Sequence, residues 1–190
     1  MSKIFGIGLN KTATTTLHEA LTILGFRSLH YKARPDDEPA DDAVFRAQEE
    51  GLPLLTYIAG YDAYSDIWPL IHNFDVLDEQ YPGSRFVLTV RPVDQWIDSR
   101  RRHVERNIAR RQAGDYDGDF LVVDEALWRE QWERQVGRAR RYFKGRRDFL
   151  EVNFTADPGW VQLCEFLELP EPDAPFPWAN RDRRRGADPC

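Results

Sequence analysis

Near the amino terminus, a lysine and four threonines follow a short apolar run. The run KIFGIG, residues 3–8, is followed by Lys11, Thr12, Thr14, Thr15 and Thr16. The apolar residues that come next recur at helical spacing, so the polar stretch joins a predicted strand to a predicted helix. The first N–H groups of a helix are unpaired and its dipole is positive there, while hydroxyls and a lysine add donors and charge. These residues therefore predict a binding site for a phosphate or sulfate group.

A magnesium-dependent kinase or nucleoside triphosphatase is the obvious alternative for such a turn. Its phosphate loop requires glycine immediately before the lysine and again five residues before that, but this chain has Asn10 and Phe5 at those positions. The strand predicted at RFVLTV, residues 85–90, is followed by Arg91 and not by the aspartate that would organise the metal ion. The sequence therefore supports metal-dependent phosphoryl transfer poorly.

The turn resembles the 5′-phosphosulfate loop of the sulfotransferases that use 3′-phosphoadenosine 5′-phosphosulfate (PAPS), which reads approximately Lys-x-Gly-Thr-Thr. Residues 11–16, KTATTT, match that loop, with Ala13 at the position of the usual glycine. A second family signature is a strand that ends in arginine, with a serine eight residues later on the next helix. In YPGSRFVLTVRPVDQWIDS these positions are Arg91 and Ser99. Because LELPEPDAPFPWAN is also similar to the family's closing segment, the resemblance covers nearly the whole chain.

The resemblance implies transfer of a sulfuryl group from PAPS to a hydroxyl or amine of a small-molecule acceptor. It implies that Lys11 stabilises the leaving oxygen and that Arg91 and Ser99 hold the 3′-phosphate. The 5′-phosphosulfate would lie against Lys11, Thr12, Ala13, Thr14, Thr15 and Thr16. We expect no requirement for a metal ion, since the moving group carries less charge than a phosphoryl group. Two alternatives stay open: an inactive nucleotide-binding module on the same fold, and a magnesium-dependent small-molecule kinase.

An acceptor hydroxyl also needs a general base, which in the resembled family follows the strand before the 3′-phosphate motif. The segment GYDAYSDIWPL offers Asp62 and Asp66. We prefer Asp66, because it comes just before a helix predicted to begin near Pro69 and so could point to the same edge of the sheet. His30, at the end of a predicted second strand, is the reserve. Asp66 could instead cap that helix, which is a common role of aspartate.

Strands that alternate with helices predict an α/β fold with a parallel, doubly wound sheet, and the family resemblance makes it a three-layer, P-loop NTPase-like one. We expect strands at residues 3–8, 26–31, 52–60, 85–90 and 149–154. Helices are expected at 69–81, 93–112, 123–144 and 157–167, with a weak helical pattern near 44–50. We predict one sulfotransferase domain over residues 1–180 and a mobile tail over 181–190, which includes the basic run RDRRRG.

Composition indicates the cellular location of the protein and excludes some classes of partner. The formal net charge of −6 and the sequence pI of about 5.3 argue against nucleic acid or anionic lipid as a partner. The only cysteines are Cys164 and Cys190, so we expect neither a disulfide framework nor a zinc cluster. We therefore expect a soluble cytoplasmic protein whose acceptor pocket is formed by residues 32–66 and 113–122.

Overall fold

The computed structural model of the protein describes residues 2–33 and 37–178. The chain divides into two compact units, one formed by Met1–Val90 with Gly145–Cys190 and the other by Arg91–Lys144. The tail predicted at 181–190, with its basic run, lies outside the described residues. Whether residues 1–180 behave as a single domain stays a prediction.

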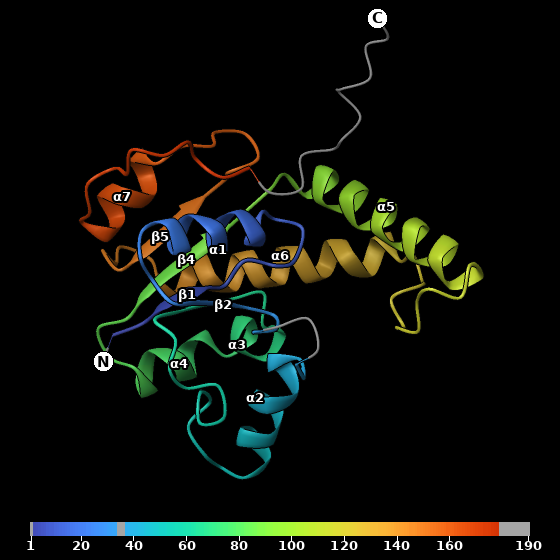
Figure 1. Ribbon diagram of the computed structural model, residues 1–190, viewed down its shortest axis with the longest axis horizontal. Coiled ribbons are helices and arrows are strands. Elements are labelled where there is room, and N and C mark those ends of the chain that lie inside the picture. Colours follow the sequence, from blue (N-terminus) through green and yellow to red (C-terminus); the bar gives the residue numbers. More distant parts are fainter. Residues whose placement is uncertain (1, 34–36, 179–190) are drawn as a thin grey trace, which may run out of the picture. The chain divides into compact units, whose positions relative to one another are not determined.

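The first unit contains a sheet of five strands, all parallel, in the order β2-β3-β1-β4-β5 (Figure 1). Central strands of such a sheet are covered on both faces, which is why β1 and β4 consist almost entirely of buried residues. The sheet confirms the predicted α/β fold class. The strands are β1 Ile4–Gly6, β2 Ser28–His30, β3 Ala63–Ser65, β4 Arg85–Thr89 and β5 Phe149–Val152.

Alternating residues of β1 face the two sides of this sheet. Ile4 belongs to a buried cluster with Leu17 of α1 (Thr14–Ile23) and Leu163 of α7 (Val161–Leu167). Phe5 points the other way and packs on the rings of Tyr64, Tyr81 and Phe86. Figure 1 shows α1 and α7 on one side of the sheet and α3 (Trp68–His72) and α4 (Phe74–Gln80) on the other. Helix α2 spans Ala40–Glu49.

Two predicted elements differ in the structure. Residues 52–60 form turns, and the strand after β2 is β3 at 63–65. The apolar side chains of Leu54 and Leu55 are buried as predicted, but their N–H groups bond to the side chains of Gln80 and Tyr81 and not to a neighbouring strand. The helix predicted at 69–81 is divided into α3 and α4 at Asn73, whose side-chain amide donates to the carbonyl of Pro69 at 2.7 Å.

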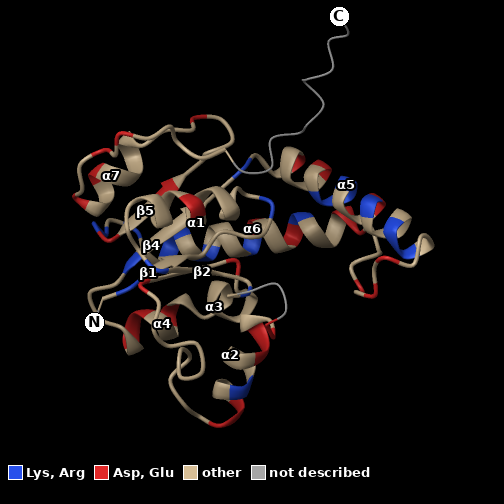
Figure 2. Cartoon of the chain, in the orientation of Figure 1, with Lys and Arg blue, Asp and Glu red and all other residues tan. Residues whose placement is uncertain are grey.

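The second unit consists of α5 (Val93–Gln112), α6 (Glu125–Tyr142) and the segment that joins them. Both helices lie close to their predicted ranges. Within this unit the guanidinium of Arg100 is enclosed by three aromatic rings, and its burial lowers its pKa to about 10. The ring centroids of Trp96, Phe120 and Trp128 lie 4.8, 4.9 and 4.8 Å from its central carbon. Figure 2 shows, by its blue segments, further basic residues along α5.

None of the helices in the described part of the chain is long and apolar enough to cross a membrane.

Candidate functional site

The turn between β1 and α1 passes very close to the end of β4. A Cβ atom added to Gly8 would lie 2.1 Å from the hydroxyl oxygen of Thr89 and 2.4 Å from its carbonyl oxygen, so only glycine fits there. The hydroxyl of Thr12 donates to the carbonyl of Leu9 at 2.6 Å and lies 2.8 Å from the hydroxyl of Thr89. Thr12 is therefore buried, and its side chain fastens the turn to the end of β4.

Two residues of this turn have left-handed backbone conformations, with φ of 67° at Lys11 and 72° at Ala13. Ala13 is the N-cap of α1 and, being alanine, has no side-chain oxygen to accept from the first N–H groups of the helix. The conformation at residue 13 is the one that glycine adopts without strain, which agrees with the glycine usual there in the resembled loop. The amino end of α1 therefore has no side-chain cap, and the positive end of a helix dipole favours an anion.

The remaining threonines of the turn differ in exposure. Thr14 and Thr16 are buried, with 4% exposure each, whereas Lys11 and Thr15 are partly exposed. The hydroxyl of Thr14 lies 3.4 Å from Nε2 of His30 and bonds to the carboxyl of Asp66. Thr14 therefore links the first turn of α1 to the ends of two neighbouring strands.

Asp66 and His30 lie at the carboxyl edge of the sheet. His30 is the last residue of β2 and pairs with Ser65, the last residue of β3, so Asp66 follows directly. Oδ2 of Asp66 is 3.5 Å from Nε2 of His30. Burial raises the pKa of Asp66 to about 6, against the opposing effects of the Lys11 charge and the Thr14 hydrogen bond. Burial lowers the pKa of His30. Asp66 has φ of 56°, and the N-cap of the helix that follows is Ile67, with no side-chain cap hydrogen bond of its own, so Asp66 does not have the alternative role of a helix cap.

Sequence reasoning missed two ionisable residues near this edge. Asp41, in the first turn of α2, accepts from the N–H of Trp68 at 2.9 Å, and burial together with the charge of Asp66 raises its pKa to about 6. Nδ1 of His18 lies 2.9 Å from the hydroxyl of Ser28, and its ring centroid is 5.4 Å from that of His30. Asp41 stands 25 positions before Asp66 in the sequence, so no local pattern indicated the approach.

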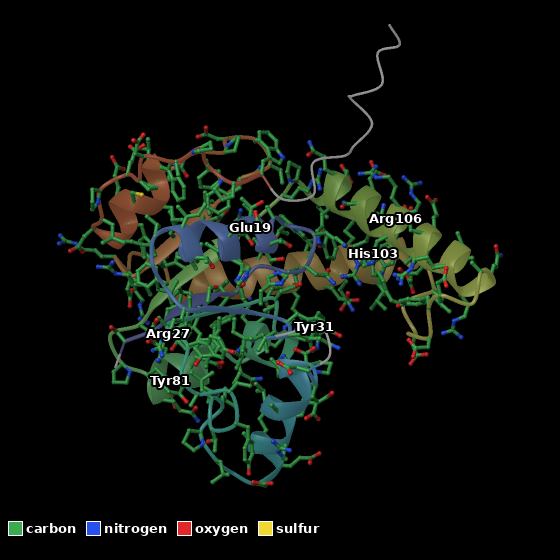
Figure 3. All side chains as sticks on the ribbon, in the orientation of Figure 1. Glu19, Arg27, Tyr31, Tyr81, His103 and Arg106 are labelled. Carbon is green, nitrogen blue, oxygen red and sulfur yellow. The ribbon has the colours of Figure 1, made fainter. Side chains whose placement is uncertain are left out.

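Asp62 lies at the other edge of the sheet. It precedes β3, and its carboxylate accepts from Nε and Nη2 of Arg27, each at 3.1 Å. These hydrogen bonds and the backbone N–H of Arg27 lower the pKa of Asp62 to about 2. Figure 3 labels Arg27 and Tyr31, which flank β2 at its amino and carboxyl ends, respectively. The structure thus separates Asp62 from Lys11 and Asp66.

Arg91 and Ser99 belong to the second unit. Arg91 follows Thr89 by two positions in the chain, and Ser99 lies within α5; both are partly exposed. Thr89 is the residue that contacts the turn through Thr12. The assignment of Arg91 and Ser99 to a common ligand with Lys11 stays a prediction.

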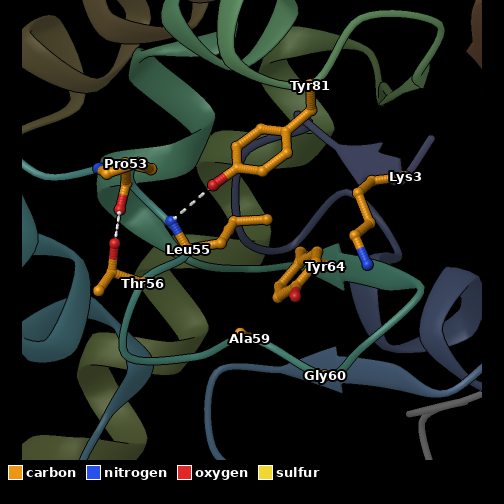
Figure 4. A pocket seen from close by; sticks show the side chains of 8 residues that line it. All are labelled: Lys3, Pro53, Leu55, Thr56, Ala59, Gly60, Tyr64 and Tyr81. Atoms are coloured by element: carbon orange, nitrogen blue, oxygen red, sulfur yellow. Dashed lines mark hydrogen bonds between the residues drawn. The ribbon is translucent and has the colours of Figure 1, made fainter. Parts of the chain in front are cut away.

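A small hollow of about 170 Å³ opens elsewhere in the first unit (Figure 4). Lys3, Tyr64 and Tyr81 line it together with residues of the 53–60 segment, and Lys3 donates to the carbonyl of Tyr61 at 2.6 Å. None of the residues predicted to bind PAPS or to act as the base borders this hollow, but its lining residues from Pro53 to Tyr64 belong to the segment 32–66 that was predicted to form the acceptor pocket. Among residues 2–33 and 37–178, no group of three or more His, Cys, Asp or Glu side chains is arranged to hold a metal ion.

Comparison with known proteins shows to which family the chain belongs. No curated protein matches this chain. A family model described as "Sulfotransferase domain" matches residues 3–115 and 112–184, which together are most of the chain. The matched residues include the turn between β1 and α1, the strands of the sheet and α5. The chain therefore belongs to the sulfotransferase domain family.

Proposed function

We propose that this protein transfers a sulfuryl group from PAPS to a hydroxyl or amine of a small-molecule acceptor. The observation that carries the proposal is the turn at residues 7–13, where Gly8 lets the backbone pass directly against Thr89 and Ala13 leaves the amino end of α1 without a side-chain cap. A turn of this kind suits an anionic group held by backbone N–H donors. Membership of the sulfotransferase domain family supports a phosphosulfate as that group.

When bound, PAPS supplies the sulfuryl group on a nucleotide diphosphate that is a good leaving group. In the proposal, the backbone of residues 12–16 and the hydroxyl of Thr15 hold the 5′-phosphosulfate, since Thr15 is the part-exposed threonine of the helix start. The hydroxyl of Thr12 keeps the turn closed against Thr89. The ammonium of Lys11 neutralises charge that develops on the bridging oxygen, which is an electrostatic role that needs no metal ion.

Arg91 and Ser99 are proposed to hold the 3′-phosphate. Arginine binds a phosphate through two parallel hydrogen bonds, and a helical serine adds a third donor. Membership of the sulfotransferase domain family supports this assignment, since the resembled signature has an arginine at the end of this strand and a serine eight residues later. The 3′-phosphate would then distinguish this nucleotide from adenosine phosphates that lack it.

Asp66 is proposed as the general base. Its pKa of about 6 is close to that of an efficient base at neutral pH, and the effect of Lys11 on that pKa indicates that the two side chains act on one another. Asp62 is not carried into the proposal, because its carboxylate is neutralised by Arg27 at the other edge of the sheet. We also propose that the protein acts in the cytoplasm and that neither nucleic acid nor a membrane is its partner.

The test is a transfer assay with labelled PAPS and a panel of hydroxyl and amine acceptors, run on the wild type and two lysine variants. Lys11→Ala should lower turnover by about 100-fold or more, because one preorganised charge at a reacting centre contributes on that order. The matched control is Lys144→Ala, which removes an exposed lysine and should leave turnover unchanged. Equal turnover in the two variants would refute the role of Lys11.

Thermal denaturation with each nucleotide, together with the transfer assay, separates the alternatives. A nucleotide-binding module without activity would be protected from heat by the 3′,5′-diphosphate yet transfer nothing to any acceptor. A kinase would instead be protected by ATP and would require magnesium.

A further inference from the structure

His30 and Asp66, which the sequence analysis named as the reserve and the preferred base, lie close together in the structure. Nε2 of His30 is 3.5 Å from Oδ2 of Asp66 and 3.4 Å from the hydroxyl of Thr14. His30 comes from β2 and Asp66 from the end of β3, so neighbouring parallel strands bring them together. Catalytic contacts are often this long before substrate binds. The geometry therefore permits exchange of a proton between the two side chains.

Both side chains are accessible in part. The exposed fractions are 18% for His30 and 24% for Asp66, so an acceptor can reach the pair although water surrounds it incompletely. The strained backbone continues across this edge: φ is positive at Tyr31, which follows His30, and at Asp66. Strain of this kind persists where the surrounding structure requires it, often at functional sites.

The proton affinities of the two groups converge. Burial raises the pKa of Asp66 from 3.8 to about 6. Burial also lowers the pKa of His30 below 6.5, partly offset by a hydrogen bond to its own backbone. These shifts in opposite directions bring the two groups closer in proton affinity than a free aspartate and a free histidine. At neutral pH the pair therefore consists of a carboxylate and a neutral imidazole.

Charged and titratable neighbours approach the pair from each adjoining segment. The Lys11 ammonium favours the carboxylate form of Asp66, and His30 and His18 each disfavour protonation of the other ring through their proximity. The charge of Asp66 raises the pKa of Asp41. The groups to be considered in any titration are Lys11, His18, Glu19, Lys32 and Asp41.

We propose that the proton of the acceptor substrate passes through Asp66 to His30, so that the base of the reaction is the pair and not the carboxylate alone. This inference rests on the proposed function. As the bond between the acceptor oxygen and sulfur forms, the acceptor proton moves to the Asp66 carboxylate, and from there to Nε2 of His30, which becomes imidazolium. The bond between sulfur and the bridging oxygen breaks, and its electron pair leaves with the diphosphate. The imidazolium then releases its proton to water.

The first test needs no nucleotide. The chain has four histidines, so the ring of His30 can be followed by NMR as pH is varied. Asp66→Asn removes the neighbouring carboxylate and should lower the pKa of His30 by about one pH unit, because a nearby opposite charge favours the imidazolium. Asp62→Asn removes a carboxylate at the other edge and should leave that pKa unchanged. If both variants leave the pKa of His30 where it is, the pair is not coupled and the inference fails.

The second test uses turnover and rescue. His30→Asn should lower kcat roughly 10- to 100-fold, with little change in the affinity for the 3′,5′-diphosphate, and should alter the acid limb of the pH–rate profile. His30→Ala should regain turnover several-fold when imidazole is added. The matched control is Ser28→Ala, which removes the other polar contact between β2 and α1 and should leave the profile unchanged and show no rescue.

The outcomes distinguish this inference from the proposed function. If the wild type transfers sulfuryl groups and His30→Asn keeps the full rate and profile, His30 is not part of the base while the function stands. If the wild type neither binds PAPS nor transfers from it, the proposed function itself fails. A loss in His30→Asn that imidazole does not rescue in His30→Ala, with an unaltered pH profile, would assign His30 a structural role and overturn the inference.

Discussion

Three aspartates near β3 have the same chemical group and differ widely in proton affinity. Asp41 and Asp66 are held away from water at the carboxyl edge of the sheet, and the pKa of each is raised to about 6. Asp62 is bonded to Arg27 at the amino edge, and its pKa is lowered to about 2. The sequence offered both Asp62 and Asp66, but it could not place them at opposite ends of a strand or rank them, because β3 was not predicted and burial and the Arg27 partner arise only on folding.

Asp41 gives a prediction on stability. Its pKa in the folded chain is about 6 against 3.8 in the unfolded chain, so its carboxyl costs no stability at low pH and destabilises the fold increasingly as pH rises through about 6. Asp41→Asn keeps an oxygen that can accept from the N–H of Trp68. The variant should therefore be more stable than the wild type by about 1 kcal/mol at neutral pH and above, a value reduced for partial exposure.

Chemical denaturation across pH checks this. The gain should shrink as pH falls below about 6 and disappear below about pH 4, where the carboxyl of Asp41 in the wild type is protonated in both the folded and the unfolded chain. Asp42→Asn, at the exposed neighbouring position, is the control and should show no such trend. A gain that is constant with pH, or a loss at neutral pH, contradicts the assignment of a destabilising charge to Asp41.

Among the elements, those with a strong hydrophobic period were predicted best. The apolar runs of β1 and β4 and the long helix α5 lie close to their expected ranges. The apolar run at 52–60 was misassigned, because burial of Leu54 and Leu55 is achieved in turns whose N–H groups find side-chain acceptors. Periodicity reports which residues are buried, whereas hydrogen-bond partners decide whether a buried run becomes a strand.

The turn between β1 and α1 gives a prediction at this scale. Ala13 has φ of 72°, and a left-handed conformation costs an alanine about 1–2 kcal/mol. Ala13→Gly removes that strain, while the greater freedom of glycine in the unfolded chain costs roughly 0.4–1 kcal/mol. The free energy of unfolding should therefore be unchanged or rise by up to about 1 kcal/mol.

The matched variant is Ala109→Gly, the same change at an exposed position inside α5. It should lower the free energy of unfolding by about 1 kcal/mol, because glycine is unfavourable in a helix interior. Thermal or chemical denaturation of both variants measures these changes in the free energy of unfolding. Equal losses in the two would show that residue 13 carries no strain.

At the scale of the whole molecule, the candidate site gathers residues that are distant in sequence. The local motif of Lys11 and the threonines could be recognised from the sequence, since one turn contains it. The approach of Asp41 and Asp66, and the contacts of His18 and His30 with their partners, depend on the parallel pairing of β2 and β3 and on the packing of α1. No spacing rule connects such positions, so only the folded chain could reveal them.

The central claim is that Lys11 with its turn and Arg91 with Ser99 bind the two phosphate groups of one nucleotide. Titration calorimetry of the wild type with 3′-phosphoadenosine 5′-phosphate and with adenosine 5′-phosphate tests it most directly. The account predicts a single site at which the 3′-phosphate improves affinity about 10- to 100-fold, as expected for hydrogen bonds to a charged group. Arg91→Ala should abolish that preference. Equal affinity for the two nucleotides, or no binding of either, would contradict the account.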